Sequence, residues 1–334
     1  MDRVAHLAAD QRRDLFSETA ARLGMTPAVV EKDFWVTWVL QRLFADSALT
    51  RLLMFKGGTS LSKAYGLIER FSEDIDLILD WRVLGGDDPL AERSHSQQDR
   101  LNKAIDRQGV AYIAGPLLER ISAATAGVCQ CAVGADDAHV IELRYPAAFS
   151  DTYLRPELRL EIGPLAAWLP HEDRSITCYA AQAFPQVFGQ TEFPVRVIRA
   201  ERSFWEKAAI LHHEAHRPPD SALPARYSRH YYDLARMADS VVKDAALADT
   251  ALLADVVAFK QRFYPRGWAR YDLAVRGSLR LVPGGGALKA LEADYRAMAD
   301  MIFGRIPSFD DIAARLGALE AEINGSSHDE HRPA

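Results

Sequence analysis

The chain has 334 residues, of which 49% are hydrophobic and 26% charged, a composition typical of a soluble globular protein. Its formal charge of −6 excludes nucleic-acid binding through overall positive charge, so such a partner would need local basic patches. The first residues lack the apolar run of a signal peptide, and no later run is long enough to span a membrane. We therefore expect a cytoplasmic protein with no membrane partner.

Strand patterns fall in the first two hundred residues, and helical patterns dominate after about residue 200. Strand candidates alternate apolar and polar residues, whereas helix candidates repeat every three or four residues. In chain order we predict helices at 5–23 and 28–44, a strand at 52–56, a helix at 60–70, a strand at 75–81, a polar helical region at 90–127, strands at 139–146, 156–164 and 193–198, and a helix at 202–216.

This order of elements predicts an α+β fold, in which a mixed sheet with flanking helices precedes a mainly helical C-terminal domain. We place the sheet domain, with its N-terminal helices, at residues 1–199 and the helical domain at 200–324. Residues 325–334 are polar, and we expect them to form a disordered tail.

Two aspartates, Asp74 and Asp76, are separated by one residue at the start of the second strand candidate. Side chains at i and i+2 of a strand share a face, so the two carboxylates lie roughly 6 to 7 Å apart and repel each other. A divalent cation removes this conflict, because Mg²⁺ prefers oxygen ligands, often one or two carboxylates together with substrate phosphates. The pair therefore predicts a site for Mg²⁺, or for Mn²⁺, of the kind that serves phosphoryl transfer.

A glycine-rich turn precedes these aspartates. Gly57 and Gly58 allow the backbone to approach a phosphate closely, and the helix that follows offers N–H donors and partial positive charge at its N-terminus. Thr59 and Ser60 add hydroxyl donors. The order of residues differs from a Walker A loop, which disfavours a P-loop ATPase. Taken alone, the glycine turn is explained as well by a capped turn, and the aspartate pair by an acidic edge of a sheet. Together the two features predict nucleotide binding.

The glycine turn followed by D-x-D on the next strand resembles the signature of the DNA polymerase β-like nucleotidyltransferases. Within that superfamily the chain resembles the AbiEii/AbiGii toxin nucleotidyltransferases, which include the MenT toxins. The segments that carry this resemblance follow in the family's order: V-E-K-D-F-W-V-T-W-V-L (30–40), F-K-G-G-T-S-L-S-K-A-Y (55–65), R-F-S-E-D-I-D-L (70–77), R-S-F-W-E-K-A-A-I-L (202–211) and S-R-H-Y-Y-D-L-A-R-M (228–237).

The resemblance implies a nucleotidyltransferase fold whose helical domain completes the active-site cleft. It also implies a phosphate-binding turn at 58–60, metal ligands Asp74 and Asp76, and essential residues Lys207 and Asp233. Lys207 lies in an otherwise apolar helical pattern, where its charge can grip a triphosphate; without the family, an exposed helix lysine is the simpler explanation. Asp233 follows two tyrosines, and a carboxylate buried there needs a partner, which we expect to be Lys207.

Polymerase-like sites usually have a third carboxylate on a neighbouring strand, where it acts on the attacking hydroxyl. We expect this group to be Glu161, with Glu142 as the alternative; a solvent-facing strand glutamate fits the pattern equally well. Arginines interleaved with aromatic residues at 262–280 suit either contact with RNA or an ordinary salt-bridged surface. If RNA binds, we expect the C-terminal helices to form one wall of the cleft.

These patterns predict an enzyme that binds an NTP with a divalent metal ion, transfers NMP and releases pyrophosphate. The resemblance implies a toxin of a phage-defence type of toxin–antitoxin system, an RNA acceptor such as the 3′ end of tRNA, and a cognate antitoxin protein. Two alternatives stay open: transfer to a small molecule or protein hydroxyl, and a catalytically inactive nucleotide- or RNA-binding module. Retention of Asp74, Asp76 and Lys207 argues against the inactive module, since a binder need not keep two repelling carboxylates.

Overall fold

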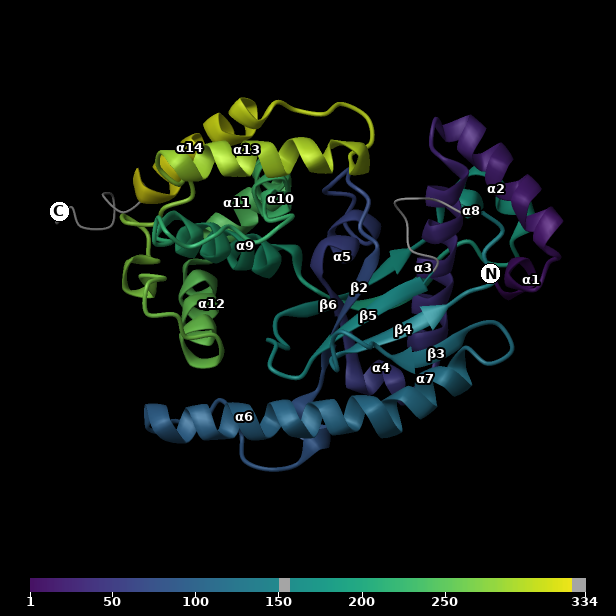
Figure 1. Ribbon diagram of the computed structural model, residues 1–334, viewed down its shortest axis with the longest axis horizontal. Helices are drawn as coiled ribbons and strands as arrows, with labels where there is room; N and C mark the ends of the chain where they lie inside the picture. The colour runs from purple at the N-terminus through teal and green to yellow at the C-terminus, as the bar shows by residue number, and fades with distance from the viewer. Residues whose placement is uncertain (150–156, 326–334) are drawn as a thin grey trace. The chain divides into compact units, whose positions relative to one another are not determined.

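The computed structural model describes residues 1–149 and 157–325 (Figure 1). The chain forms two compact units, the first made of Met1–Ala64 and Phe71–Ile198, and the second of Tyr65–Arg70 with the described residues from Arg199 onward. The chain therefore enters the second unit twice, first for one short segment and then for the helices. The tail expected from residue 325 lies outside the described residues, apart from Gly325 at the end of the last helix.

A seven-stranded mixed sheet forms the centre of the first unit, which confirms the predicted α+β class (Figure 1). The strand order is β3-β4-β5-β2-β1-β7-β6, so the strand with the two aspartates, β2, is the central one. It runs antiparallel to β1 and parallel to β5. The strands are β1 (Leu53–Lys56), β2 (Asp74–Leu79), β3 (Gln130–Val133), β4 (Val140–Arg144), β5 (Glu157–Gly163), β6 (His171–Ile176) and β7 (Phe193–Ile198).

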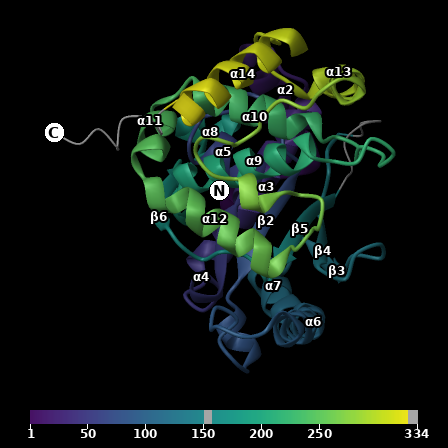
Figure 2. The same cartoon turned by 90° about the vertical axis from the view of Figure 1, so that its left-hand side faces the viewer.

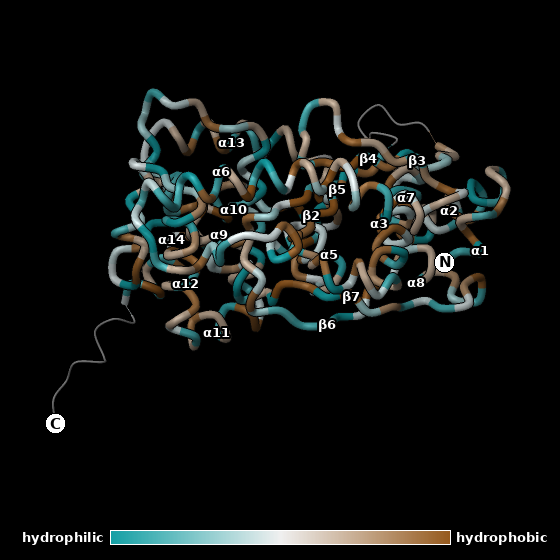
Figure 3. The backbone as a smooth tube through the Cα atoms, turned by 90° about the horizontal axis from the view of Figure 1, so that it is seen from below, coloured by the Kyte–Doolittle hydropathy of each residue, from teal (hydrophilic) through white to brown (hydrophobic). Residues whose placement is uncertain are grey.

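The two faces of the sheet differ in polarity. Ile75 and Leu77 of β2 lie on one face and are at most 1% exposed. Asp74, Asp76 and Ile78 alternate with them and lie on the opposite face, which we call the carboxylate face. Figure 3 shows hydrophobic residues concentrated along the central strands, which form the core of this unit.

The helices of the first unit differ from the predictions in several places, and the short helices α4 and α8 were not predicted. The helix expected at 5–23 is divided into α1 and α2, and the helix expected at 60–70 starts at Gly57 and ends at Lys63. Gly66 has a φ of +62°, a left-handed conformation that an α-helix cannot continue through. The helices are α1 (Asp2–Ala5), α2 (Ala9–Leu23), α3 (Pro27–Ala45), α4 (Leu49–Leu52), α5 (Gly57–Lys63), α6 (His95–Tyr112), α7 (Leu118–Ala124) and α8 (Tyr179–Ala183).

The second unit is mainly helical in its described residues, with α10 packed against α9, α13 and α14 (Figure 2). Its helices are α9 (Ala200–Ala215), α10 (Ser228–Ala238), α11 (Val241–Ala248), α12 (Thr250–Phe263), α13 (Gly286–Met298) and α14 (Phe309–Gly325). Across the described part of the chain, no helix combines the length and the apolar character needed to cross a bilayer.

Candidate functional site

Asp76 lies against the glycine turn between β1 and α5. A Cβ atom added to Gly57 would overlap the Asp76 carboxylate and would stand 2.5 Å from its Cγ. Gly57 also has a φ of +79°, a conformation that favours glycine. Only glycine therefore fits at position 57 beside the carboxylate. The Asp76 carboxylate lies at the N-terminal end of α5.

Asp74 and Asp76 share the carboxylate face with basic neighbours. Arg159 of β5 is opposite Asp74 in register, and Lys56 of β1 is opposite Asp76. From the repulsion between the aspartates, the sequence predicted a metal ion as the only source of compensating positive charge. These two side chains provide part of the balancing positive charge, a contribution that the sequence argument missed.

Glu161 is also on the carboxylate face, opposite Asp76 in the parallel ladder of β2 and β5. Its side chain is exposed, and the alternative residue, Glu142, forms an ion pair with Arg159 at 3.0 Å. In the part of the chain that the structure describes, no three His, Cys, Asp or Glu side chains gather closely enough to hold a metal ion.

Thr59 and Ser60 direct their hydroxyl groups inward. Thr59 donates to the backbone carbonyl of Asp74, and Ser60 donates to the carbonyl of Gly57 at 2.8 Å. Both side chains are at most 2% exposed. In this structure the Thr59 hydroxyl holds the turn against β2 and the Ser60 hydroxyl bonds within α5, whereas the sequence predicted both as donors to a phosphate. The first N–H groups of a helix have no partner within it, so those of Gly57 and Gly58 stay candidates for that role.

Buried charges on α3 hold both halves of this site. Lys32, 1% exposed, forms an ion pair with Glu73 at 2.8 Å, one residue before Asp74. Asp33, also 1% exposed, pairs with Lys63 at the end of α5. Because an unpaired buried charge costs several kcal/mol, these two ion pairs hold α5 and the start of β2 against α3.

A buried cluster of three charged residues lies in the second unit. Lys207 of α9 donates to Oδ2 of Asp233 on α10 at 2.7 Å, the pairing that the sequence predicted. Arg70 donates to the same carboxylate twice, from Nε to Oδ1 at 2.7 Å and from Nη2 to Oδ2 at 2.8 Å. None of the three side chains is more than 9% exposed. The sequence reasoning missed Arg70, although it begins the motif R-F-S-E-D-I-D-L.

Two cations and one carboxylate give this cluster a net positive charge. Burial lowers the pKa of Lys207, and Asp233 partly reverses that shift. Burial alone would raise the pKa of Asp233, but Arg70 and Lys207 outweigh it and hold the pKa below its ordinary value. Asp233 therefore stays ionised, and an anionic group such as a phosphate complements the cluster.

The segment Tyr65–Arg70, which we call the strap, has further contacts in the second unit. The N–H group of Glu69 donates to the hydroxyl oxygen of Tyr232 at 3.3 Å. The carbonyl of Glu69 accepts a hydrogen bond from the N–H group of Phe303 at 2.7 Å. The strap is thus fixed by its backbone as well as by the Arg70 side chain.

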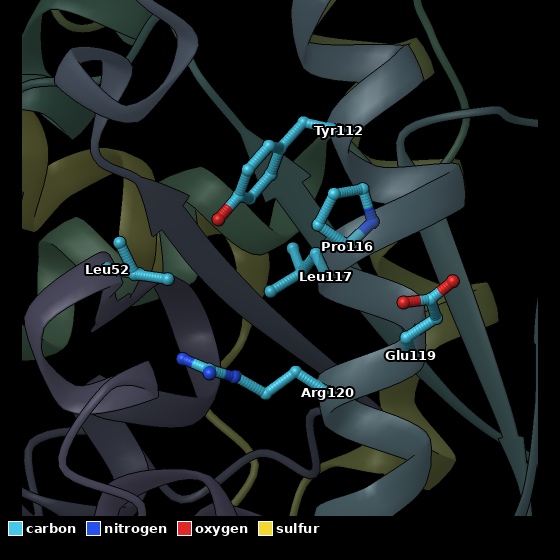
Figure 4. Close-up of a pocket in the computed structure, with 6 residues that line it drawn as sticks. All are labelled: Leu52, Tyr112, Pro116, Leu117, Glu119 and Arg120. Carbon is cyan, nitrogen blue, oxygen red and sulfur yellow. The ribbon is translucent and has the colours of Figure 1, made fainter.

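A cavity of about 440 Å³ in the first unit is separate from these residues (Figure 4). It lies where Pro116 interrupts the run from α6 to α7 with a π-helical turn, Ile113–Leu117. The hydroxyl of Tyr112 and the guanidinium of Arg120 point into this space, with Leu52 across from them (Figure 4). Leu52 precedes β1, whereas the glycine turn follows that strand, so the cavity is at the other end of β1 from the predicted site.

A mixed sheet that presents two carboxylates beside a glycine turn is the arrangement that the sequence analysis expected of a nucleotidyltransferase. The family model described as "Nucleotidyl transferase AbiEii toxin, Type IV TA system" matches residues 38–315. The chain therefore belongs to the AbiEii family of nucleotidyltransferase toxins, which confirms the resemblance seen in the sequence. Membership implies an NTP substrate and an antitoxin partner.

Among solved structures, the chain is similar to MenT4, a nucleotidyltransferase toxin from Mycobacterium tuberculosis H37Rv. The two are 18% identical with a TM-score of 0.45, and the match covers 94% of this chain and 97% of that chain. No curated protein sequence matches the chain.

Proposed function

We propose that the protein transfers NMP from an NTP to an RNA acceptor in a reaction that needs a divalent metal ion. The observation that carries this proposal is the placement of Asp74 and Asp76 on one face, with Gly57 against the Asp76 carboxylate. Two carboxylates with substrate phosphates match the ligand preference of Mg²⁺, and Mn²⁺ accepts the same oxygen ligands. When bound, the ion supplies charge that stabilises the attacking and leaving oxygens.

Lys207 is proposed to bind the phosphates of the same nucleotide, with Asp233 and Arg70 as its support. Arg70 and Lys207 both bind the Asp233 carboxylate, so the loss of either cation or of the carboxylate changes the charge that the others present to a phosphate.

Glu161 remains the proposed third carboxylate, since the register puts it beside Asp76 on an exposed part of the face. In this role it accepts the proton of the attacking hydroxyl. The RNA acceptor, with the 3′ end of tRNA as the proposed site of transfer, rests on membership of the toxin family. The setting proposed for this reaction is the cytoplasm, where a cognate antitoxin restrains the enzyme.

Labelled NTPs test the proposal when they are incubated separately with total tRNA, with small-molecule acceptors and with cell protein. We expect label on tRNA in the presence of Mg²⁺ or Mn²⁺ and none after chelation. Asp76→Asn should abolish transfer, because it removes the charge while keeping the shape of the side chain beside Gly57. Asp173→Asn is the matched control, since Asp173 is 66% exposed on the edge strand β6. Label that appears only on small molecules or protein contradicts the RNA acceptor.

A further inference from the structure

The carboxylate face continues past the aspartates into a buried apolar cluster. Ile78 is two residues beyond Asp76 on β2 and therefore lies on the same face. It forms a buried cluster with Met54, its partner on β1, and with Ile198 of β7. Trp168, from the segment after β5, is partly buried against this cluster. An indole ring is thus held on the same face as the two carboxylates.

A guanidinium group lies between this ring and a second indole. Trp81 follows β2 in a short 3₁₀ turn. The Cζ atom of Arg82 is 5.8 Å from the ring centroid of Trp81 and 5.9 Å from that of Trp168. Asp80 pairs with Nε of Arg82 at 3.0 Å, while the Arg82 side chain stays 58% exposed. We call Trp81, Arg82 and Trp168 the indole platform.

Aromatic rings beside a guanidinium are a feature of surfaces on which proteins hold single-stranded nucleic acid. The rings stack on bases, and the guanidinium attracts the phosphates between them. The buried aliphatic cluster below Trp168 restrains the ring, so little side-chain freedom is lost when a base binds. Four residues, 77–80, separate Asp76 from Trp81, so the five steps of extended chain span about 17 Å at roughly 3.3 Å per residue, a distance that a few nucleotides cover.

Two of the arginines that the sequence associated with RNA have partners within the second unit. Arg270 pairs with Asp272 at 2.8 Å, and Arg276 donates to the carbonyl of Leu247. The indole platform places an exposed guanidinium against two indole rings, a combination that suits both the phosphates and the bases of an acceptor.

We propose that the indole platform binds bases a few nucleotides from the reacting end of a single-stranded RNA acceptor. This inference rests on the proposed function and adds to it the part of the acceptor that the first unit recognises. The recognition is by stacking and charge, so it tolerates different base sequences.

The test measures binding of a fluorescein-labelled single-stranded oligoribonucleotide to the full chain by anisotropy over a range of salt concentrations. Trp168→Ala should weaken binding roughly 5- to 100-fold, the range typical for loss of one base–aromatic stack, while Trp168→Phe should retain most of the affinity. Arg82→Gln should reduce the slope of log affinity against log salt by about 0.7, because one phosphate contact is lost. Arg174→Gln is the matched control: the same charge is lost from β6, where Arg174 is opposite Val195 and lies on the other face of the sheet.

Oligonucleotide affinity unchanged in both Trp168→Ala and Arg82→Gln overturns the inference, as does a wild-type protein that does not bind the oligonucleotide. A raised KM for NTP with unchanged oligonucleotide affinity also overturns it and assigns the platform to the nucleotide base. The proposed function is tested separately, because Asp76→Asn should bind the oligonucleotide like the wild type and transfer nothing. If the wild type transfers NMP to RNA and the platform variants bind and react like it, the proposed function holds and the inference about the platform fails.

Discussion

Arg70 and Asp233 form a two-pronged ion pair inside the second unit, with N–O distances of 2.7 and 2.8 Å. The planar fork of a guanidinium fits a carboxylate in this way, and the ammonium of a lysine does not. The pair joins the strap to α10 and leaves Oδ2 of Asp233 shared with Lys207. The two cations therefore depend on one carboxylate.

Replacing Arg70 should destabilise the second unit more than replacing an exposed arginine of the same unit. We expect Arg70→Gln to lower the free energy of unfolding by about 3 kcal/mol, because Asp233 loses two buried hydrogen bonds and one of its two cations. Urea denaturation followed by circular dichroism measures the loss. Arg236→Gln is the control, since Arg236 and Glu69 are 40% and 53% exposed and their 3.3 Å ion pair should contribute less than about 1 kcal/mol. Equal losses in the two variants would contradict the role of the buried pair.

Lowering the pH should reduce the contribution of Asp233 to the free energy of unfolding. Burial raises its pKa, but Arg70 and Lys207 outweigh burial, so the folded-state pKa lies below the value of about 3.9 in the unfolded chain. Between these two values the unfolded chain binds more protons, so the stabilisation is complete above about pH 4 and declines as the pH falls toward the folded-state pKa. We expect the difference in unfolding free energy between wild type and Asp233→Asn to shrink below about pH 4. A difference that stays constant down to about pH 3 would show that the charge of Asp233 is not responsible.

Alanine variants of Gly57 and Gly66 distinguish the effect of backbone strain from the effect of displacing the Asp76 carboxylate. Both have positive φ, +79° and +62°, but only at Gly57 would a Cβ atom meet the Asp76 carboxylate; around Gly66 nothing lies within 4 Å. Alanine at either position should cost about 1 kcal/mol of stability. Gly57→Ala should also reduce kcat about 100-fold, because it displaces the carboxylate. Similar kcat values for the two variants would refute the close approach that the structure shows.

The ion pair of Lys32 with Glu73 can be tested with a double-mutant cycle. Lys32→Met should destabilise the first unit by about 3 kcal/mol, since it leaves Glu73, whose side chain is 13% exposed, without its cation. Adding Glu73→Leu should recover much of that loss, because no unpaired charge remains. Denaturation of the two single variants and the double variant measures the coupling. Additive losses would mean that the two side chains act independently.

The sequence predicted the parts of the site that are close together in the chain. The turn at Gly57 and the carboxylate of Asp76 belong to adjacent elements, so periodicity and glycine chemistry were sufficient. The pairing of Lys207 with Asp233 was predicted from the resemblance to the family, which singled out both residues, and from the need of a buried carboxylate for a partner. Arg70 was not, because its partner is distant in sequence and the residues before it look helical.

Other differences have local physical causes. Thr59 and Ser60 looked like ligands for a phosphate, but nearby backbone carbonyls compete for their hydroxyl protons. The strands β3 and β6 were missed because they are the two edges of the sheet, where polar residues are tolerated and the alternating pattern is weak. Lys32 and Asp33 were not recognised as buried charges, since only the tertiary structure supplies their partners.

The strap affects how the chain folds during synthesis and where it can be cut into fragments. Arg70 emerges from the ribosome long before α10 is synthesised, so the ion pairs of Asp233 can form only late in translation. A fragment that begins at Arg199 lacks the hexapeptide that completes its buried charges, and a fragment that ends at Ile198 carries that hexapeptide without its partners. Exchange of either unit between relatives must therefore include the strap that matches the helices.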